Sequence, residues 1–410
     1  MLRALGYDEG EAGDFRWSSP VSLAQQAGIA PDQIRFSDFR RADVVTVSYA
    51  ALAAEMKGHS GETLAQSLVR RGVLSQDALG KYYDPDALKN RGMGASFAEN
   101  VTEFYNTLRL PQGIDISGPP VRFYNSVALI GDAGYELFGF LPTYAQNTAE
   151  KIAAGAAAVE GKARVFGIIV PNRLGAVLSY EDADRICRSE KNETETVRYF
   201  NEQMGDKVCA VDAITNLRLH NDEYIFFRTD HHWTALGSYY AYEAWAKAAG
   251  VAPVPLENFD TKEYTGHLGL FNSMCEFPAS MRANPDTVVA YIPHSSFTCE
   301  PAGAMDFTGW GYNTFIGGDR PITTIVNNDI TDDSACVLVK DSYGNPFAVW
   351  LTQHYHTVYV LDYRYYRNLW DHLTFSRFAE EKGVEDFIIL LPITTSMNPY
   401  IASCLSLYCR

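Results

Sequence analysis

Two short segments of the sequence carry side chains that together could perform nucleophilic chemistry. Residues 228–234 hold Asp230 and His232, and residues 340–346 hold Ser342. A carboxylate two residues from an imidazole can fix the tautomer of that ring and stabilise its protonated form. A serine beside such a base becomes a nucleophile, and the N–H groups of a tight turn can stabilise the resulting oxyanion. The residue types predict serine-dependent acyl transfer with Asp230, His232 and Ser342 as catalytic residues.

Each segment also has a simpler structural interpretation. Asp230 and Ser342 are residue types that often cap the start of a helix. The histidines near Asp230, with two further along the chain, are an alternative set of metal ligands: His231, His232, His354 and His356. No H-E-x-x-H or similar ligand spacing occurs, so we expect no metal and no cofactor. We expect His231 to be structural, because successive side chains leaving a strand point to opposite sides.

Both segments are predicted to lie where a strand is followed by a helix. Apolar runs alternate with helical patterns along residues 123–410, which is typical of a parallel sheet covered on both faces. The predicted strands span residues 127–130, 165–170, 208–213, 224–227, 337–339, 358–361 and 387–391, and the main helices 143–160, 233–249, 346 onward and 372–382. Since reactive groups gather at the carboxyl ends of such strands, Ser342 and His232 should lie roughly 3 Å apart.

Composition limits the partners and the domain plan. The chain has 410 residues and a net charge of −16, a sign that disfavours binding to nucleic acid or anionic membranes. The seven cysteines lack C-x-x-C spacing and allow at most a disulfide such as one between Cys404 and Cys409. We expect a small helical module over residues 1–90, a linker rich in proline and glycine over 91–122, and an α/β domain over 123–410 with a loop-rich insertion at about 252–333.

The first residues show no secretory signal and no apolar run long enough for a membrane helix, so we expect any export signal to lie outside this chain. Leu5-Gly6-Tyr7, Gly28-Ile29 and Arg41-Ala42-Asp43 resemble the S-layer-homology type of helical module. That resemblance implies binding to a cell-wall polymer. The alternative is a plain helical cap on the main domain.

The segment Thr229-Asp230-His231-His232-Trp233-Thr234 matches the signature of the DHHW protein family of Gram-positive bacteria. That family resembles the SGNH-hydrolase-like polysaccharide O-acetyltransferases of the alginate-acetylation type. The resemblance implies a three-layer α/β fold in which Asp230, His232 and Trp233 form one motif and Ser342 with Tyr343 forms the other. Residues 131–138 and 362–364 are similar to two further strands of that family. The resemblance covers about residues 120–395.

The sequence departs from ordinary SGNH hydrolases in two ways. The Asp-His motif precedes the serine, and no Gly-x-Asn-Asp motif supplies an oxyanion donor. We therefore expect oxyanion stabilisation or substrate binding from the N–H of Ser342 and from the side chains of Asn345, Tyr343, Arg364, Asn172 and Trp233.

The resemblance implies an extracytoplasmic enzyme that forms an acetyl-serine and passes acetyl to a polysaccharide. It also implies a membrane-bound O-acyltransferase as the acetyl donor and a location in the envelope of a Gram-positive bacterium. Two alternatives stay open: an acetyl-esterase with the same triad, and a non-catalytic carbohydrate-binding or scaffold protein. A transferase must keep water from the acyl-serine, and the insertion could wall a groove with Tyr264, His267, Phe271 and Trp310.

Overall fold

The structure is a computed structural model that describes residues 2–7, 23–24, 27, 29, 47–48, 50–71, 73 and 113–410. The chain divides into two compact units, Met1–Leu110 and Pro111–Arg410. The division falls within the predicted linker at 91–122. Within the described residues, no helix is long and apolar enough to cross a membrane.

The described part of the first unit is small. It contains the 3-10 helix η1 (Leu2–Leu5), the antiparallel strands β1 (Glu55–Met56) and β2 (His59–Thr63), and helix α3 (Leu64–Arg70). Thr63 and Gln66 form a capping box that fixes the start of α3. Much of the predicted S-layer-homology module, including Arg41-Ala42-Asp43, lies outside the described residues.

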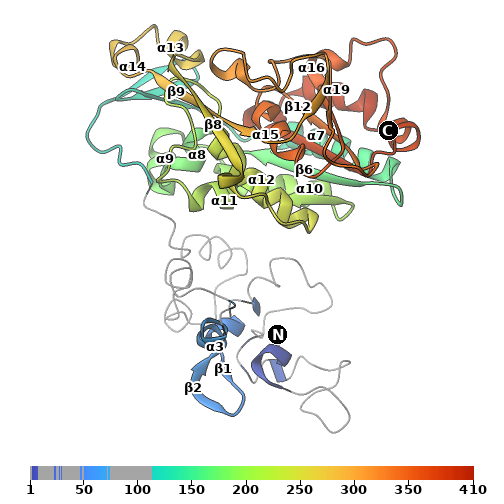
Figure 1. The fold of residues 1–410 in the computed structure, drawn as a ribbon. Helices are drawn as coiled ribbons and strands as arrows, with labels where there is room; N and C mark the ends of the chain where they lie inside the picture. The colour runs from blue at the N-terminus through green and yellow to red at the C-terminus, as the bar shows by residue number, and fades with distance from the viewer. Residues whose placement is uncertain are drawn as a thin grey trace. The chain divides into compact units, whose positions relative to one another are not determined.

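A mixed sheet forms the centre of the second unit (Figure 1). Within the described residues it has seven strands in the order β10 (Phe297–Glu300), β11 (Ile322–Asn327), β13 (Thr357–Asp362), β12 (Ala335–Lys340), β14 (Asp386–Pro392), β6 (Arg164–Val170) and β7 (Val208–Val211). The strands from β13 to β7 are parallel, whereas β10 and β11 pair antiparallel at one edge. The predicted α/β fold with a mainly parallel sheet is confirmed.

Two groups of helices cover the two faces of this sheet. Along β6, Phe166 and Ile168 face one buried cluster and Val165 and Ile169 face the other, because strand side chains alternate. The first cluster contains residues of α11 (Ala213–Leu219), α12 (Ala235–Ala249) and α15 (Gly344–Leu351). The second contains residues of α7 (Pro142–Ala158), α10 (Glu193–Met204), α17 (Phe375–Lys382) and α19 (Pro399–Tyr408). Both faces are therefore buried, which explains the continuous apolar strands.

Smaller elements surround the sheet. Strands β3 (Val121–Tyr124), β4 (Val127–Ile130) and β5 (Ala133–Glu136) form an antiparallel sheet, and β8 (Phe259–His267) pairs with β9 (Asp286–Pro293). The remaining short helices are α8 (Arg173–Val177), α9 (Tyr180–Ile186), η3 (Leu256–Asn258), α13 (Leu270–Met274), α14 (Ala279–Ala283), η4 (Gly311–Thr314), α16 (Tyr363–Tyr366) and α18 (Ile393–Ser396).

The segment at 252–333, predicted as a loop-rich insertion, contains β8 to β11, and two of these strands extend the main sheet. One strand prediction is wrong. Residues 224–227 do not form a strand; Phe226 makes a single bridge to Trp233. The apolar run there reflects burial in the core rather than sheet pairing.

Candidate active site

The serine lies in the tight turn that joins β12 to α15. The carboxylate of Asp341 accepts a hydrogen bond from the N–H of Tyr343 at 3.0 Å, which closes the turn around Ser342. Gly344 follows because any side chain there would overlap the aliphatic part of Lys340. The turn therefore holds the serine at the carboxyl end of a central parallel strand.

The segment that carries Asp230 and His232 is held by a buried carboxylate from β9. Asp286 accepts hydrogen bonds from the N–H of Thr229 at 2.8 Å and from its hydroxyl at 2.6 Å. On the other side of the segment, Thr234 caps α12 by accepting a hydrogen bond from the N–H of Gly237. The segment is thus fixed at both ends before the long helix begins.

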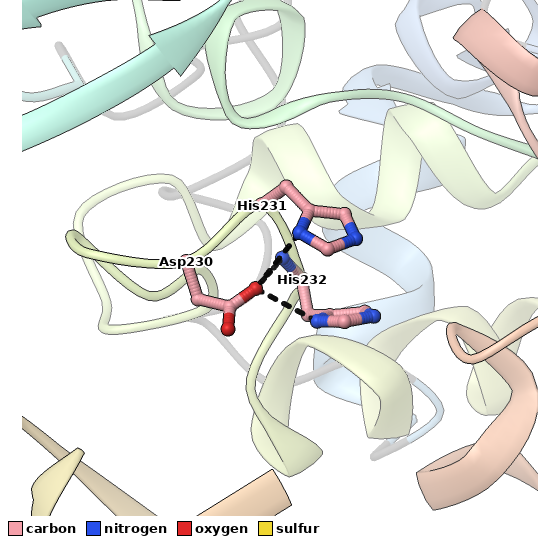
Figure 2. A group of neighbouring side chains, drawn as sticks. All are labelled: Asp230, His231 and His232. Carbon is pink, nitrogen blue, oxygen red and sulfur yellow. Dashed lines mark hydrogen bonds and ion pairs between the residues drawn. The ribbon is translucent and has the colours of Figure 1, made fainter. Parts of the chain in front are cut away.

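Ser342, His232 and Asp230 form a continuous hydrogen-bonded chain. The Oγ atom of Ser342 lies 2.7 Å from Nε2 of His232, although the two residues are 110 positions apart in the sequence. Nδ1 of His232 lies 2.8 Å from Oδ1 of Asp230 (Figure 2). The expected proximity of Ser342 and His232 is therefore confirmed.

The groups that surround His232 favour a neutral imidazole that can act as a base. The Asp230 carboxylate can only accept, so His232 carries its proton on Nδ1 and leaves Nε2 to accept from the serine hydroxyl. Burial, aided by the neighbouring His231, lowers the pKa of His232 to about 4. Burial opposes ionisation of Asp230, but the surrounding histidines, led by His232, hold its pKa well below the usual value. His232 can therefore act as a general base at neutral pH.

The expectation that His231 points away from His232 is wrong. Nδ1 of His231 lies 3.0 Å from the same Asp230 oxygen, and the two imidazole rings are 3.9 Å apart between centroids (Figure 2). Residues 228–232 form bends rather than a strand, so the alternation of side chains does not apply. The ligand-type atoms of Asp230, His231 and His232 lie within 4.8 Å of one another, but Ser342 already contacts Nε2 of His232. His354 instead contacts the Tyr242 hydroxyl.

Two residues of the 252–333 segment complete the surroundings of the triad. Nε2 of buried His267 lies 3.2 Å from Oδ2 of Asp230, the oxygen that His232 does not contact. The ring of Tyr312 stacks on the His232 ring with 4.0 Å between centroids, and its hydroxyl donates to the carbonyl of Ser342 at 3.1 Å. His267 was expected only as a groove wall, and Tyr312 was not expected at the site.

A buried ionic network lies beside the serine turn and takes up two of the expected substrate-binding residues. The Nζ atom of Lys340 donates to Asp319 at 3.0 Å and to Asn345 at 2.7 Å. The guanidinium of Arg364 contacts Asp319 at 2.8 Å and Asp362 at 2.5 Å. The amide of Asn345 also donates to Asp319 at 3.0 Å. Asn345 and Arg364 thus brace the ends of β12 and β13 in this structure.

Trp233, Tyr343 and Asn172 are the other residues predicted to bind substrate or stabilise the oxyanion. Trp233 is fully buried and donates to the Tyr343 carbonyl at 2.9 Å, and its role in substrate binding stays a prediction. Tyr343 is also buried, and its hydroxyl donates to the His231 carbonyl. Asn172 follows β6, separated from β12 by β14, and its buried side-chain amide has no hydrogen-bond partner among the described residues. The Ser342 N–H likewise has none there, so it remains available as an oxyanion donor.

The fold and this site define an α/β domain with a mainly parallel sheet and a Ser-His-Asp arrangement. Residues 111–361 match the family model described as "DHHW protein", which spans more than half of the chain. The chain belongs to the DHHW family.

Solved structures of similar fold come from bacterial proteins. A DHHW family protein from Eubacterium siraeum is 24% identical, with a TM-score of 0.62, and the match covers 72% of this chain and 98% of that one. Bacillus cereus PatB1 is 14% identical, with a TM-score of 0.52, covering 69% of this chain and 99% of that one. PatB1 with a sulfonyl adduct gives 13% identity, a TM-score of 0.52, and coverage of 70% and 99%. No curated protein matches the chain.

Proposed function

We propose that this protein is an extracytoplasmic serine-dependent enzyme that transfers acetyl groups on a cell-envelope or secreted polysaccharide. The observation that carries the proposal is the 2.7 Å contact between Ser342 and a buried His232 that Asp230 orients. A neutral imidazole in contact with a serine hydroxyl is the arrangement that acyl transfer through an acyl-serine requires.

The proposed reaction has two half-reactions. Nε2 of His232 takes the hydroxyl proton while Ser342 Oγ attacks the carbonyl carbon of an acetyl ester, and the N–H of Ser342 stabilises the oxyanion. The carbon–oxygen bond to the leaving alcohol then breaks, and His232 returns the proton to that alcohol. In the second half, a sugar hydroxyl gives its proton to His232 and its oxygen attacks the carbonyl carbon of the acetyl-serine. The bond between that carbon and Ser342 Oγ then breaks, and His232 returns the proton to Ser342 Oγ.

Two further roles come from the family resemblance and form part of the proposal. A membrane-bound O-acyltransferase supplies the acetyl group, and the segment at 1–90 binds cell-wall polymer and retains the enzyme at the surface of a Gram-positive bacterium. Fractionation of cells that express the full-length protein tests this location. Recovery in the cytosol would contradict it.

The test of the activity uses para-nitrophenyl acetate with and without oligosaccharide acceptors, followed by mass spectrometry. Acetylated oligosaccharide that disappears in Ser342→Ala supports transfer. Release of acetate at a rate independent of every acceptor favours the esterase alternative, and no turnover by the wild type favours the scaffold alternative. Because a structural relative carries a sulfonyl adduct, a sulfonyl fluoride should also label Ser342 in the wild type.

A further inference from the structure

Three large apolar side chains are exposed on the His267 side of the triad. Trp310 is 63% exposed, Leu270 48% and Leu268 36%. We refer to these three residues as the apolar rim. Leu268 and Leu270 follow the end of β8, and Trp310 directly precedes η4, so the rim comes from two separate parts of the 252–333 segment. Exposed apolar side chains gathered beside reactive groups are typical of a ligand-binding surface.

Contacts to the triad fix the position of the rim. The indole ring of Trp310 lies 6.2 Å from the imidazole of His267, which itself contacts Asp230. Gly311, at a positive φ of 61°, leaves room for His267, whose Nδ1 would be 3.0 Å from an added Cβ. The next residue, Tyr312, stacks on His232. The indole is therefore held on a short turn whose neighbouring residues contact two histidines of the site.

The loop that carries the two leucines is equally constrained. Gly269 stands between them and packs so closely on Asp230 that a side chain there would overlap the carboxylate. Its N–H donates to Thr229 at 3.1 Å, within the segment that carries the triad histidine. Leu268 and Leu270 therefore keep a fixed relation to the catalytic carboxylate while their side chains face solvent.

A rigid, exposed indole next to a histidine that contacts the catalytic carboxylate suits one class of acceptor. In a pyranose whose substituents are all equatorial, the axial C–H groups form two apolar faces that stack on aromatic rings. The net charge of −16 disfavours an anionic glycan. The structure assigns Trp310, with Leu268 and Leu270 on the loop that packs against Asp230, to the binding of a neutral, equatorially linked pyranose chain. This inference rests on the proposed function, because it names the acceptor of that reaction.

The experiment measures sugar binding and does not depend on turnover. Tryptophan fluorescence and calorimetry would follow titration of the full chain with cellohexaose and chitohexaose. We expect the wild type to bind at least one of them and Trp310→Ala to bind at least tenfold more weakly, with Trp310→Phe between the two. Trp370→Ala is the matched control, since Trp370 is 93% exposed on the segment between α16 and α17 and should leave binding unchanged.

Three results would overturn the inference. These are equal binding by Trp310→Ala and wild type, no binding of either hexaose by the wild type, or an equal loss in Trp370→Ala. A rim that instead holds acyl chains would show a selective loss of para-nitrophenyl butyrate hydrolysis in Trp310→Ala without a change in sugar binding. Thermal unfolding of Trp310→Phe checks that the fold is kept. Failure of acetyl transfer in an enzyme that still binds the hexaoses through Trp310 would count against the proposed function alone.

Discussion

Nε2 of His267 lies 3.2 Å from Oδ2 of Asp230, on the side of the carboxylate opposite His232. Nδ1 of His267 has no hydrogen-bond partner among the described residues, so the ring proton belongs on Nε2 and is donated to Asp230. A carboxylate held through both oxygens cannot rotate, and its Oδ1 stays aligned with His232. We therefore regard His267 as a positioning residue of the triad.

Replacing His267 with phenylalanine, a ring of similar size without a hydrogen-bond donor, should lower kcat for para-nitrophenyl acetate about 10- to 100-fold, a loss expected when the group that orients the triad is removed. The loss of one donor also makes Asp230 more basic, which raises the pKa of His232 and moves the acid limb of the pH profile to higher pH. Steady-state kinetics from about pH 4 to 8 would measure both effects. A lower kcat with an unmoved acid limb would reduce His267 to a packing role.

The pH dependence of the wild type provides a second test. Burial lowers the pKa of His232 to about 4, so the basic form that accepts the serine proton persists well below pH 6.5. We expect kcat/KM for the aryl acetate to stay level from about pH 7 to pH 5 and then to fall. Half-loss near the ordinary histidine pKa of about 6.5 would contradict the burial argument.

Unfolding must be separated from titration in that experiment. The folded-state pKa of His232 lies below its unfolded value, so its contribution to stability is present above about pH 6.5 and is lost as the pH falls toward 4. Circular dichroism at each pH therefore accompanies the kinetics, and only points at which the protein is folded are used.

The two adjacent histidines should behave differently when each is replaced by alanine. Only His232 contacts Ser342, so His232→Ala should lower kcat/KM about 1000-fold or more. His231→Ala should cost less than about tenfold and should shift the acid limb upward, because His231 helps to lower the pKa of His232. Equal losses in the two variants would show that our assignment of the base is wrong.

Much of the catalytic chain could be predicted because its parts are local. Asp230 and His232 lie within one short motif, and Ser342 follows a recognisable apolar strand. Parallel strands bring such strand ends to one edge, so two distant motifs could be expected to meet. The sheet itself was predictable for the same reason, since its central strands are continuous apolar runs.

The supporting residues were not predictable, because tertiary contacts alone bring them to the site. His267 ends a strand whose sequence is largely polar, and Tyr312 lies in a short 3-10 helix, so neither position carries an apolar periodic pattern. Asp319 reaches Lys340 from outside any helix or strand, and no local pattern distinguishes it from other surface carboxylates. The expected orientation of His231 failed because strand periodicity was applied to residues that form bends.

The close packing of Gly269 on Asp230 leads to a steric prediction. A methyl group at this position would overlap the carboxylate, so Gly269→Ala should displace Asp230 and lower kcat/KM about 100-fold or more. Gly139→Ala is the matched control, since Gly139 has open space around its Cβ position and no positive φ. Equal activity of the two variants would contradict the packing described for Asp230.

Glu193 at the start of α10 provides a prediction about stability. Its side chain is buried and accepts a hydrogen bond from the N–H of Asn172 at 2.7 Å. Burial raises the pKa of Glu193 from 4.5 to about 8 despite that hydrogen bond. Because the folded-state pKa is the higher one, the stabilising contribution is present below pH 4.5 and is lost as the pH rises toward 8.

Glu193→Gln should remove this pH dependence, because glutamine keeps a carbonyl acceptor for Asn172 but cannot ionise. Relative to the variant, the wild type should lose about 3 kcal/mol of unfolding free energy between about pH 4.5 and pH 7, as the shifted pKa requires. Urea unfolding of both proteins at several pH values measures that difference. Glu202→Gln, on the exposed face of the same helix, controls for the loss of one negative charge and should track the wild type. If the difference in unfolding free energy between the wild type and Glu193→Gln does not change with pH, Glu193 is not the buried neutral acid described above.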